Sequence, residues 1–364
     1  MRPALPVVLL LAACAHPGVA PRSGEVLATP ASLAEARASW IASTVRLARA
    51  RTMRGDLDGA GAILVGALDQ AGMDAEPVDR ARLQGELAGV LGEQAFYTRK
   101  GTERALRLAA EAQAGARAAG APEVEARAVH AEGFVRYGGL LWEDARDFQV
   151  PRALFTRARE LFRNSGARSG VAQETFFLGL TEEHEGKTER AGELYREARA
   201  LAEEIGDRST LSYALRHLGG LAESRGDLDQ ALALQRRSLA LREEIGLVRL
   251  VPFALIAVGD LERKKSALGD ARASYTRALR MADELDSAPA QVWSHFGLGA
   301  VDEAEGKLAP ALEHYEAARA AAQMLGSKSW IEETSAAAEK VRRKLEAATR
   351  PGASTTSGGS STGG

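Results

Sequence analysis

The apolar residues of this chain recur at spacings of three and four residues, and charged residues of both signs lie between them. This period places the apolar side chains on one face of a helix. The helical pattern itself repeats: LAEEIGD at 201–207 is followed forty residues later by LREEIGL at 241–247. The chain is therefore expected to be all-α and to consist of repeated helical units.

Alignment of the chain in steps of forty residues shows which positions repeat. An apolar residue precedes a glycine, an alanine follows twelve residues later, and then come a large and a small residue. The glycines are Gly179, Gly219, Gly259 and Gly299; the alanines are Ala191, Ala231, Ala271 and Ala311; the large residues are Tyr195, Gln235, Tyr275 and Tyr315. Units end near Gly166, Gly206, Gly246 and Gly326, with Asp286 once in place of glycine.

Each unit is predicted to be an antiparallel helix pair. Glycine and alanine allow two helix axes to approach closely, while leucine and tyrosine fill the space beside them. Gly186 and Gly226 supply the turn between the helices of their pairs. One pair cannot bury its own apolar stripe, so neighbouring pairs stack into a right-handed superhelical solenoid with a concave inner face.

The order of Leu-Gly, Gly, Ala, aromatic and Ala resembles the tetratricopeptide repeat, in the longer variant of bacterial regulators and G-protein-modulator scaffolds. The resemblance covers about residues 33–326, or about seven pairs, with weaker units toward the N-terminus. In the third unit about six surplus residues are expected between the helices, at RYGGLLWEDARDF, with Pro151 early in the second helix. Residues 327–349 are predicted to form a capping helix, and 350–364 a disordered tail.

Composition narrows the classes of function. The 47 basic and 49 acidic side chains nearly balance, which argues against a general nucleic-acid binder. Aromatic residues make up only 5% of the chain, which suits helices packed through alanine and leucine. The single cysteine, Cys14, excludes an internal disulfide and a cysteine-based metal cluster.

The N-terminus has the form of a secretory signal, with Arg2 followed by an apolar run from Ala4 to Ala13 that is too short to span a bilayer. Leu11-Ala12-Ala13-Cys14 resembles the lipobox of bacterial lipoproteins, which implies cleavage after residue 13 and acylation of Cys14. An ordinary signal peptide with an incidental cysteine is the alternative. Because Ala15, not Asp, follows Cys14, the resemblance implies the outer membrane, facing the periplasm. We expect 1–13 to be the signal peptide and 14–32 a flexible tether.

No catalytic or cofactor motif stands out, and we expect neither an enzyme nor a cofactor, nor a small-molecule substrate. The histidines lack the spacing of a zinc protease, and His184 in EEHEG is read as a solvated helix end rather than a metal ligand. The segment LGSKS at 325–329 lacks the first glycine of a phosphate loop and the strand before it.

The tetratricopeptide resemblance implies a protein or peptide partner along the concave face, held by side chains of the first helix of each pair. The candidate groove residues are Phe176, Tyr213, Arg216, Phe253, Asp260, Arg263, Trp293 and Phe296. An aromatic stripe is more often core than binding site, so packing is the favoured interpretation for each ring taken singly. The sequence thus predicts a membrane-anchored scaffold for protein interaction or envelope assembly. A regulator or sensor module that recruits a signalling partner, or a non-catalytic accessory subunit of an enzyme, are the alternatives.

Overall fold

The computed structural model describes residues 30–72, 76–98, 100–142 and 147–349. The chain divides into two compact units, 1–43 and 44–364, and every contact discussed below lies within the second unit. The predicted signal peptide with Cys14, and the tail, lie outside the described residues. Helix α1 begins at Pro30, within the segment expected to be a tether.

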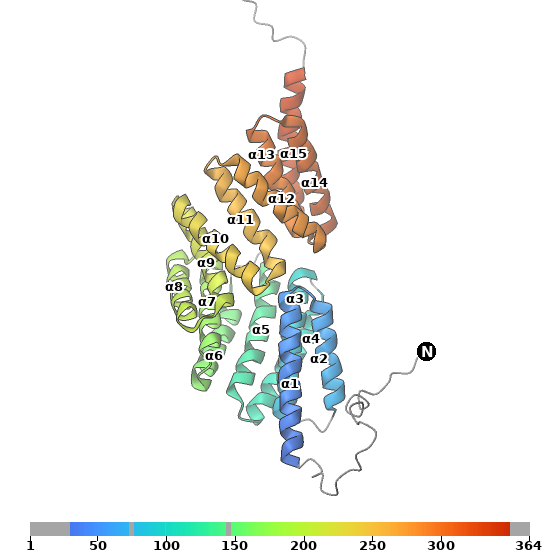
Figure 1. Ribbon diagram of the computed structural model, residues 1–364, viewed down its shortest axis with the longest axis vertical. Coiled ribbons are helices and arrows are strands. Elements are labelled where there is room, and N and C mark those ends of the chain that lie inside the picture. The colour runs from blue at the N-terminus through green and yellow to red at the C-terminus, as the bar shows by residue number, and fades with distance from the viewer. Residues whose placement is uncertain (1–29, 73–75, 99, 143–146, 350–364) are drawn as a thin grey trace, which may run out of the picture. The chain divides into compact units, whose positions relative to one another are not determined.

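The described residues form α-helices joined by short turns and one 3-10 turn (Figure 1). The helices are α1 Pro30–Met53, α2 Leu57–Ala71, α3 Pro77–Thr98, α4 Thr102–Ala118, α5 Pro122–Trp142, α6 Gln149–Ser165, α7 Arg168–His184, α8 Thr188–Ile205, α9 Arg208–Ser224, α10 Leu228–Ile245, α11 Val251–Lys264, α12 Leu268–Glu284, α13 Ala288–Ala304, α14 Leu308–Leu325 and α15 Lys328–Thr349. The 3-10 turn η2, Val248–Leu250, precedes α11.

From α3 to α14 the helices pack as six successive pairs, and α15 packs on α14. Within each pair we call the odd-numbered helix the first helix and the even-numbered one the second. Figure 1 shows the pairs following one another in chain order, from α3 in the blue part of the ribbon to α14 in red. The fold is an all-α solenoid of antiparallel helix pairs, which confirms the fold class expected from the sequence.

The turns explain why the repeat ends in glycine. Gly166, Gly206, Gly246 and Gly326 have φ between 68° and 75° and cap the helices before them. These left-handed conformations are costly for residues with a Cβ. Only Ser266 and Asp286 adopt positive φ among the described non-glycine residues, and both replace a repeat glycine.

The close contact within the pairs from α5/α6 to α13/α14 depends on a glycine of the first helix. A Cβ on Gly179 would lie 2.5 Å from Cε1 of Tyr195, and one on Gly259 would lie 2.9 Å from Cε1 of Tyr275. Tyr195 and Tyr275 are fully buried. The second-helix ring therefore occupies the space that a first-helix side chain would need, as the repeat register predicts.

The third unit departs from the expected insertion. Helix α5 continues to Trp142, so residues Arg136–Trp142 are helical rather than part of a loop. The surplus residues therefore lengthen α5 as well as the segment that follows it, of which 143–146 lie outside the described residues. Pro151 is buried in the first turn of α6, where its missing N–H is tolerated, as expected.

Helices α3 and α5 pack directly on each other, although they belong to different pairs. A Cβ on Gly92 would lie 2.9 Å from Cγ2 of Val135, and one on Gly138 would lie 3.0 Å from Cδ2 of Phe96. Glycines on both helices thus admit a large side chain of the other. In the part of the chain that is described, no helix is long and apolar enough to cross a membrane.

The glycine contact predicts opposite effects at two glycines of the first helices. Gly179→Ala should lower the free energy of unfolding by about 1–3 kcal/mol, because the new Cβ overlaps the ring of Tyr195. Gly220→Ala should raise it by up to about 1 kcal/mol, because Gly220 lies mid-helix with no atom near its Cβ position. Urea unfolding of both variants checks this, and equal effects at the two positions would contradict the register.

Candidate functional site

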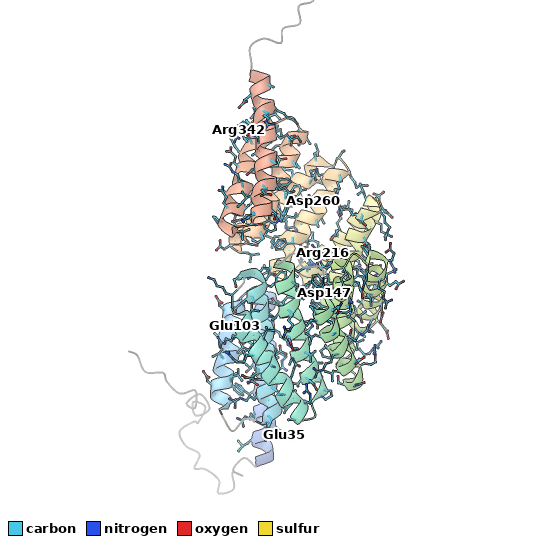
Figure 2. The ribbon with its side chains drawn as sticks, turned by 180° about the vertical axis from the view of Figure 1, so that it is seen from behind. Glu35, Glu103, Asp147, Arg216, Asp260 and Arg342 are labelled. Atoms are coloured by element: carbon cyan, nitrogen blue, oxygen red, sulfur yellow. The ribbon has the colours of Figure 1, made fainter. Side chains whose placement is uncertain are left out.

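The candidate groove residues lie on four successive first helices, α7, α9, α11 and α13. Figure 2 labels two of them, Arg216 on α9 and Asp260 on α11. Phe176 is 2% exposed and packs against Tyr195 and Tyr213, with ring centroids 5.6 and 5.4 Å away. It is therefore part of the core between α7, α8 and α9, and the other seven residues are partly exposed.

Asp260 and Arg263 are tied to the tyrosine of their own pair. The hydroxyl of Tyr275 donates to Oδ1 of Asp260 at 2.6 Å, and an Nη of Arg263 lies 3.9 Å from the same oxygen. Burial raises the pKa of the Asp260 carboxyl, while the hydrogen bond from Tyr275 opposes that shift. Nε of Arg263 is buried without a hydrogen-bond partner, so this guanidinium retains donor capacity.

In two other pairs the tyrosine hydroxyl also donates to a first-helix carboxylate, but the acid is a glutamate. The hydroxyl of Tyr195 donates to Oε2 of Glu183, and that of Tyr315 donates to Oε2 of Glu303 at 3.2 Å. Both glutamates stand twelve residues before their tyrosine, whereas Arg263 holds that position before Tyr275. The α11/α12 pair therefore takes its acid from Asp260, one helical turn earlier.

The rings of the last pairs point into helix interfaces as well as toward solvent. Trp293 packs edge-on against Phe296 and against Trp330 of α15, with centroid distances of 5.9 and 5.3 Å. Phe296 packs on Tyr315 at 5.3 Å, and Phe253 lies against the core of α11, α12 and α13. All three first-helix rings are half-buried, so each combines packing with an accessible edge.

Tyr213 and Arg216 lie in a polar network. Nδ1 of His217 lies 2.9 Å from Oε2 of Glu183, and its Nε2 lies 3.2 Å from Nη1 of Arg216. Burial lowers the pKa of His217, which favours a neutral ring that donates from Nδ1 and accepts at Nε2. Arg242 of α10 places its guanidinium 5.6 Å from the centroid of the Tyr213 ring.

Residues of α3 complete this network, and sequence reasoning did not identify them. Glu93 and Tyr97 interact electrostatically with Tyr213. Burial raises the pKa of Glu93 to about 7, although Arg249 and His130 act to lower it. The guanidinium carbon of Arg249 lies 4.3 Å from the centroid of the Tyr97 ring. The one signal in the sequence is that Arg249 stands where three other units have Ser169, Ser209 and Ser329.

A second buried acid lies on α7. Glu174 is 0% exposed, and its Oε1 lies 2.8 Å from Nδ1 of His130 on α5. Burial raises the pKa of this carboxyl, and His130 counteracts the shift. His184 accepts or donates a hydrogen bond with the hydroxyl of Tyr137 at 2.8 Å. Among the described residues no group of three or more His, Cys, Asp or Glu side chains is arranged to hold a metal ion.

Comparison with known proteins supports the repeat assignment. Residues 171–244, which span α7 to α10, match the tetratricopeptide repeat family. No curated protein matches the chain in sequence.

Solved structures extend the likeness over most of the chain. A Rap protein in complex with Competence and Sporulation Factor superposes with a TM-score of 0.52 at 14% identity, covering 86% of this chain and 99% of the other. Cut9 from the APC/C hetero-tetramer Cut9–Hcn1 gives 0.53 at 15% identity, covering 85% and 59%. Aspartyl phosphate phosphatase F from Bacillus subtilis gives 0.49 at 14% identity, covering 85% and 84%. The two similarities with TM-scores above 0.5 establish a tetratricopeptide-like fold, in agreement with the family match.

The pKa of Glu93 predicts a pH-dependent stability. Between the ordinary value of 4.5 and about 7 the folded chain holds a proton at Glu93 that the unfolded chain has lost. The free energy of unfolding should therefore fall as pH rises through this window, on the order of 1–3 kcal/mol from this group.

Glu93→Gln should remove that contribution and make the chain more stable than wild type above pH 7. Urea unfolding between pH 4.5 and 8 measures the difference, with Glu103→Gln on the exposed start of α4 as the control. Parallel pH curves for wild type and Glu93→Gln would contradict a raised pKa.

Proposed function

We propose that this chain is a lipid-anchored scaffold of the bacterial cell envelope that holds a polypeptide partner on the inner face of its helix pairs. The observation that carries the proposal is the set of partly exposed aromatic and charged side chains on successive first helices. Phe253, Arg263, Trp293 and Phe296 form the part of that set on α11 and α13. Aromatic and arginine side chains contribute most of the binding energy in many protein interfaces.

The fold supports a binding role. Two tetratricopeptide-like structures that resemble this chain were solved with a second molecule, Competence and Sporulation Factor in one and Hcn1 in the other. A stack of helix pairs presents equivalent first-helix positions at regular intervals, which suits an extended or helical polypeptide. Arg263, whose side chain is 34% exposed, adds a guanidinium, which fits a carboxylate of the partner.

The anchor and the location rest on the sequence. Leu11-Ala12-Ala13-Cys14 supports cleavage after residue 13 and acylation of Cys14, and Ala15 supports the outer membrane, facing the periplasm. Several acyl chains on one N-terminus give stable attachment. A regulator that recruits a signalling partner is the second candidate, favoured by the likeness to the Rap protein.

The anchor is tested by Cys14→Ser, which removes the acyl acceptor. We expect wild type to fractionate with membranes and to incorporate labelled palmitate, and the variant to lose both properties. Ser23→Ala, in the same N-terminal segment, is the control. A variant that is still processed and membrane-bound would show that Cys14 is incidental, whereas a wild-type chain that is neither processed nor membrane-bound would favour the regulator.

The groove is tested at Arg263. Partners are captured from detergent-solubilised membranes with the wild-type chain, identified, and their affinity is measured. Arg263→Ala should weaken binding about tenfold, or 1.4 kcal/mol, at an unchanged melting temperature. Arg280→Ala, on the exposed side of α12, should bind like wild type. Unchanged affinity in Arg263→Ala would remove this part of α11 from the proposed site.

A further inference from the structure

Arg249 makes a contact that a solenoid does not require. Each unit of a repeat stack normally touches only its neighbours. Nη1 of Arg249, in the turn η2 before α11, donates to the carbonyl oxygen of Gly55 at 3.2 Å, across 194 residues of sequence. The same guanidinium lies over the ring of Tyr97 near the end of α3. One side chain thus joins the start of the α11/α12 pair to the α1–α2 turn and to α3.

The aliphatic part of the Arg249 side chain packs directly against Gly55. A Cβ on Gly55 would lie 2.5 Å from Cγ and 2.7 Å from Cδ of Arg249. Gly55 also has φ of +84°, as the other turn glycines do. Gly226, with φ of +82°, has no atom within 4 Å of its Cβ position. The contact with Arg249 is therefore a second reason why position 55 requires glycine, in addition to the positive φ of the turn.

The residues around η2 explain why Arg249 is directed toward Gly55 and Tyr97. Pro252 stands in the first turn of α11, where it needs no backbone partner, and the residues before it form the 3-10 turn. Arg242, only 1% exposed, donates from Nη1 to the carbonyl oxygen of Leu250 at 3.2 Å. This bond holds the end of η2 against α10, so Arg249 is aimed by a fixed turn.

Independent observations place the same segments together. A hollow of about 830 Å³ is lined by Met53 at the end of α1 together with Ile205 and Ile245 at the ends of α8 and α10. On the inner face, Tyr213 of α9 interacts electrostatically with Glu93 and Tyr97 of α3. The hollow thus brings the turn edges of these distant helices together, and the guanidinium of Arg249 over the Tyr97 ring joins the end of α3 to the start of α11.

We propose that Arg249 is a clasp which holds the α1–α2 turn and α3 against the start of α11, and that it controls access to Tyr213 and Arg216. With the clasp closed, the end of α3 is held beside the start of α11 and within electrostatic range of Tyr213, where it restricts access to this part of the inner face. A polypeptide reaches Tyr213 and Arg216 only when the clasp opens. The control of access rests on the proposed scaffold function, whereas the clasp contact itself does not.

The clasp itself is tested without a partner. Hydrogen exchange of wild type is compared with Arg249→Ala and with Arg190→Ala, an exposed arginine paired with Glu193 at 2.6 Å. We expect Arg249→Ala to speed exchange about tenfold in the α1–α2 turn and at the end of α3, and Arg190→Ala to leave both unchanged. Wild-type exchange at these segments in Arg249→Ala would overturn the clasp.

A double-mutant cycle tests the contact with Gly55. Gly226→Ala measures the loss of stability caused by positive φ alone, because its Cβ meets nothing. Gly55→Ala should lower the melting temperature further than Gly226→Ala, and Arg249→Ala should abolish that excess. Equal losses at the two glycines, in both backgrounds, would show that the Arg249 stem does not lie on Gly55.

Control of access is tested with a partner captured as described above. Arg249→Ala should bind this partner at least several-fold more tightly than wild type, and the added variant Tyr213→Ala should reverse the gain. Equal affinity of wild type and Arg249→Ala, with exchange showing an open clasp, would overturn the control of access. Absence of any captured partner would count against the scaffold function alone, because exchange reads the clasp separately.

Discussion

The structure depends on one steric contact that recurs in the pairs from α5/α6 to α13/α14, where a glycine of the first helix lies against a large side chain of the second. Because a Cβ on Gly259 or Gly299 would come within about 3 Å of a tyrosine ring, these helices cannot approach in the same way with any other residue. The buried ring brings its hydroxyl into the pair, where it needs an acceptor. That requirement draws Glu183, Asp260 and Glu303 from the first helices into hydrogen bonds. The packing of the pairs thereby decides which first-helix side chains are left for a partner.

These contacts divide the inner face into two parts, one around α9 and one around α11 and α13. Around α9, Tyr213 and Arg216 belong to a network that includes side chains of α3 and α10, where burial and the neighbouring guanidinium of Arg216 contribute to lowering the pKa of Arg242 to about 10. Around α11 and α13 the half-buried residues pack only with helices nearby in sequence, among the contacts described here. We propose that the chain itself covers the first part and that the second part holds the partner.

Ion pairs within the helix pairs reinforce the stack without selecting a partner. Arg168 of α7 pairs with Glu204 of α8, and forty residues later Arg208 of α9 pairs with Glu244 of α10, each at 2.7 Å. These exposed pairs each contribute little to stability. They do use up much of the surface charge in local contacts, which is consistent with the near balance of 47 basic and 49 acidic side chains. Arg249 differs because its contacts are with distant segments, so its removal affects the arrangement of the stack rather than one interface.

The forty-residue spacing by itself determined the helix pairs, their turns and the packing glycines, because these depend on short-range geometry that recurs in every unit. It also marked Asp286 as a substitution, and Asp286 adopts the positive φ of the glycines that it replaces, as Ser266 does at the turn within its pair. The roles of Phe176 and Asp260 could not be read from the same spacing, since a first-helix position can face a partner or a neighbouring helix at the same register. The contacts of Arg249 with Gly55 and Tyr97 were decided only by the tertiary structure. They depend on the accumulated rotation from one helix pair to the next, which no local pattern of residues specifies.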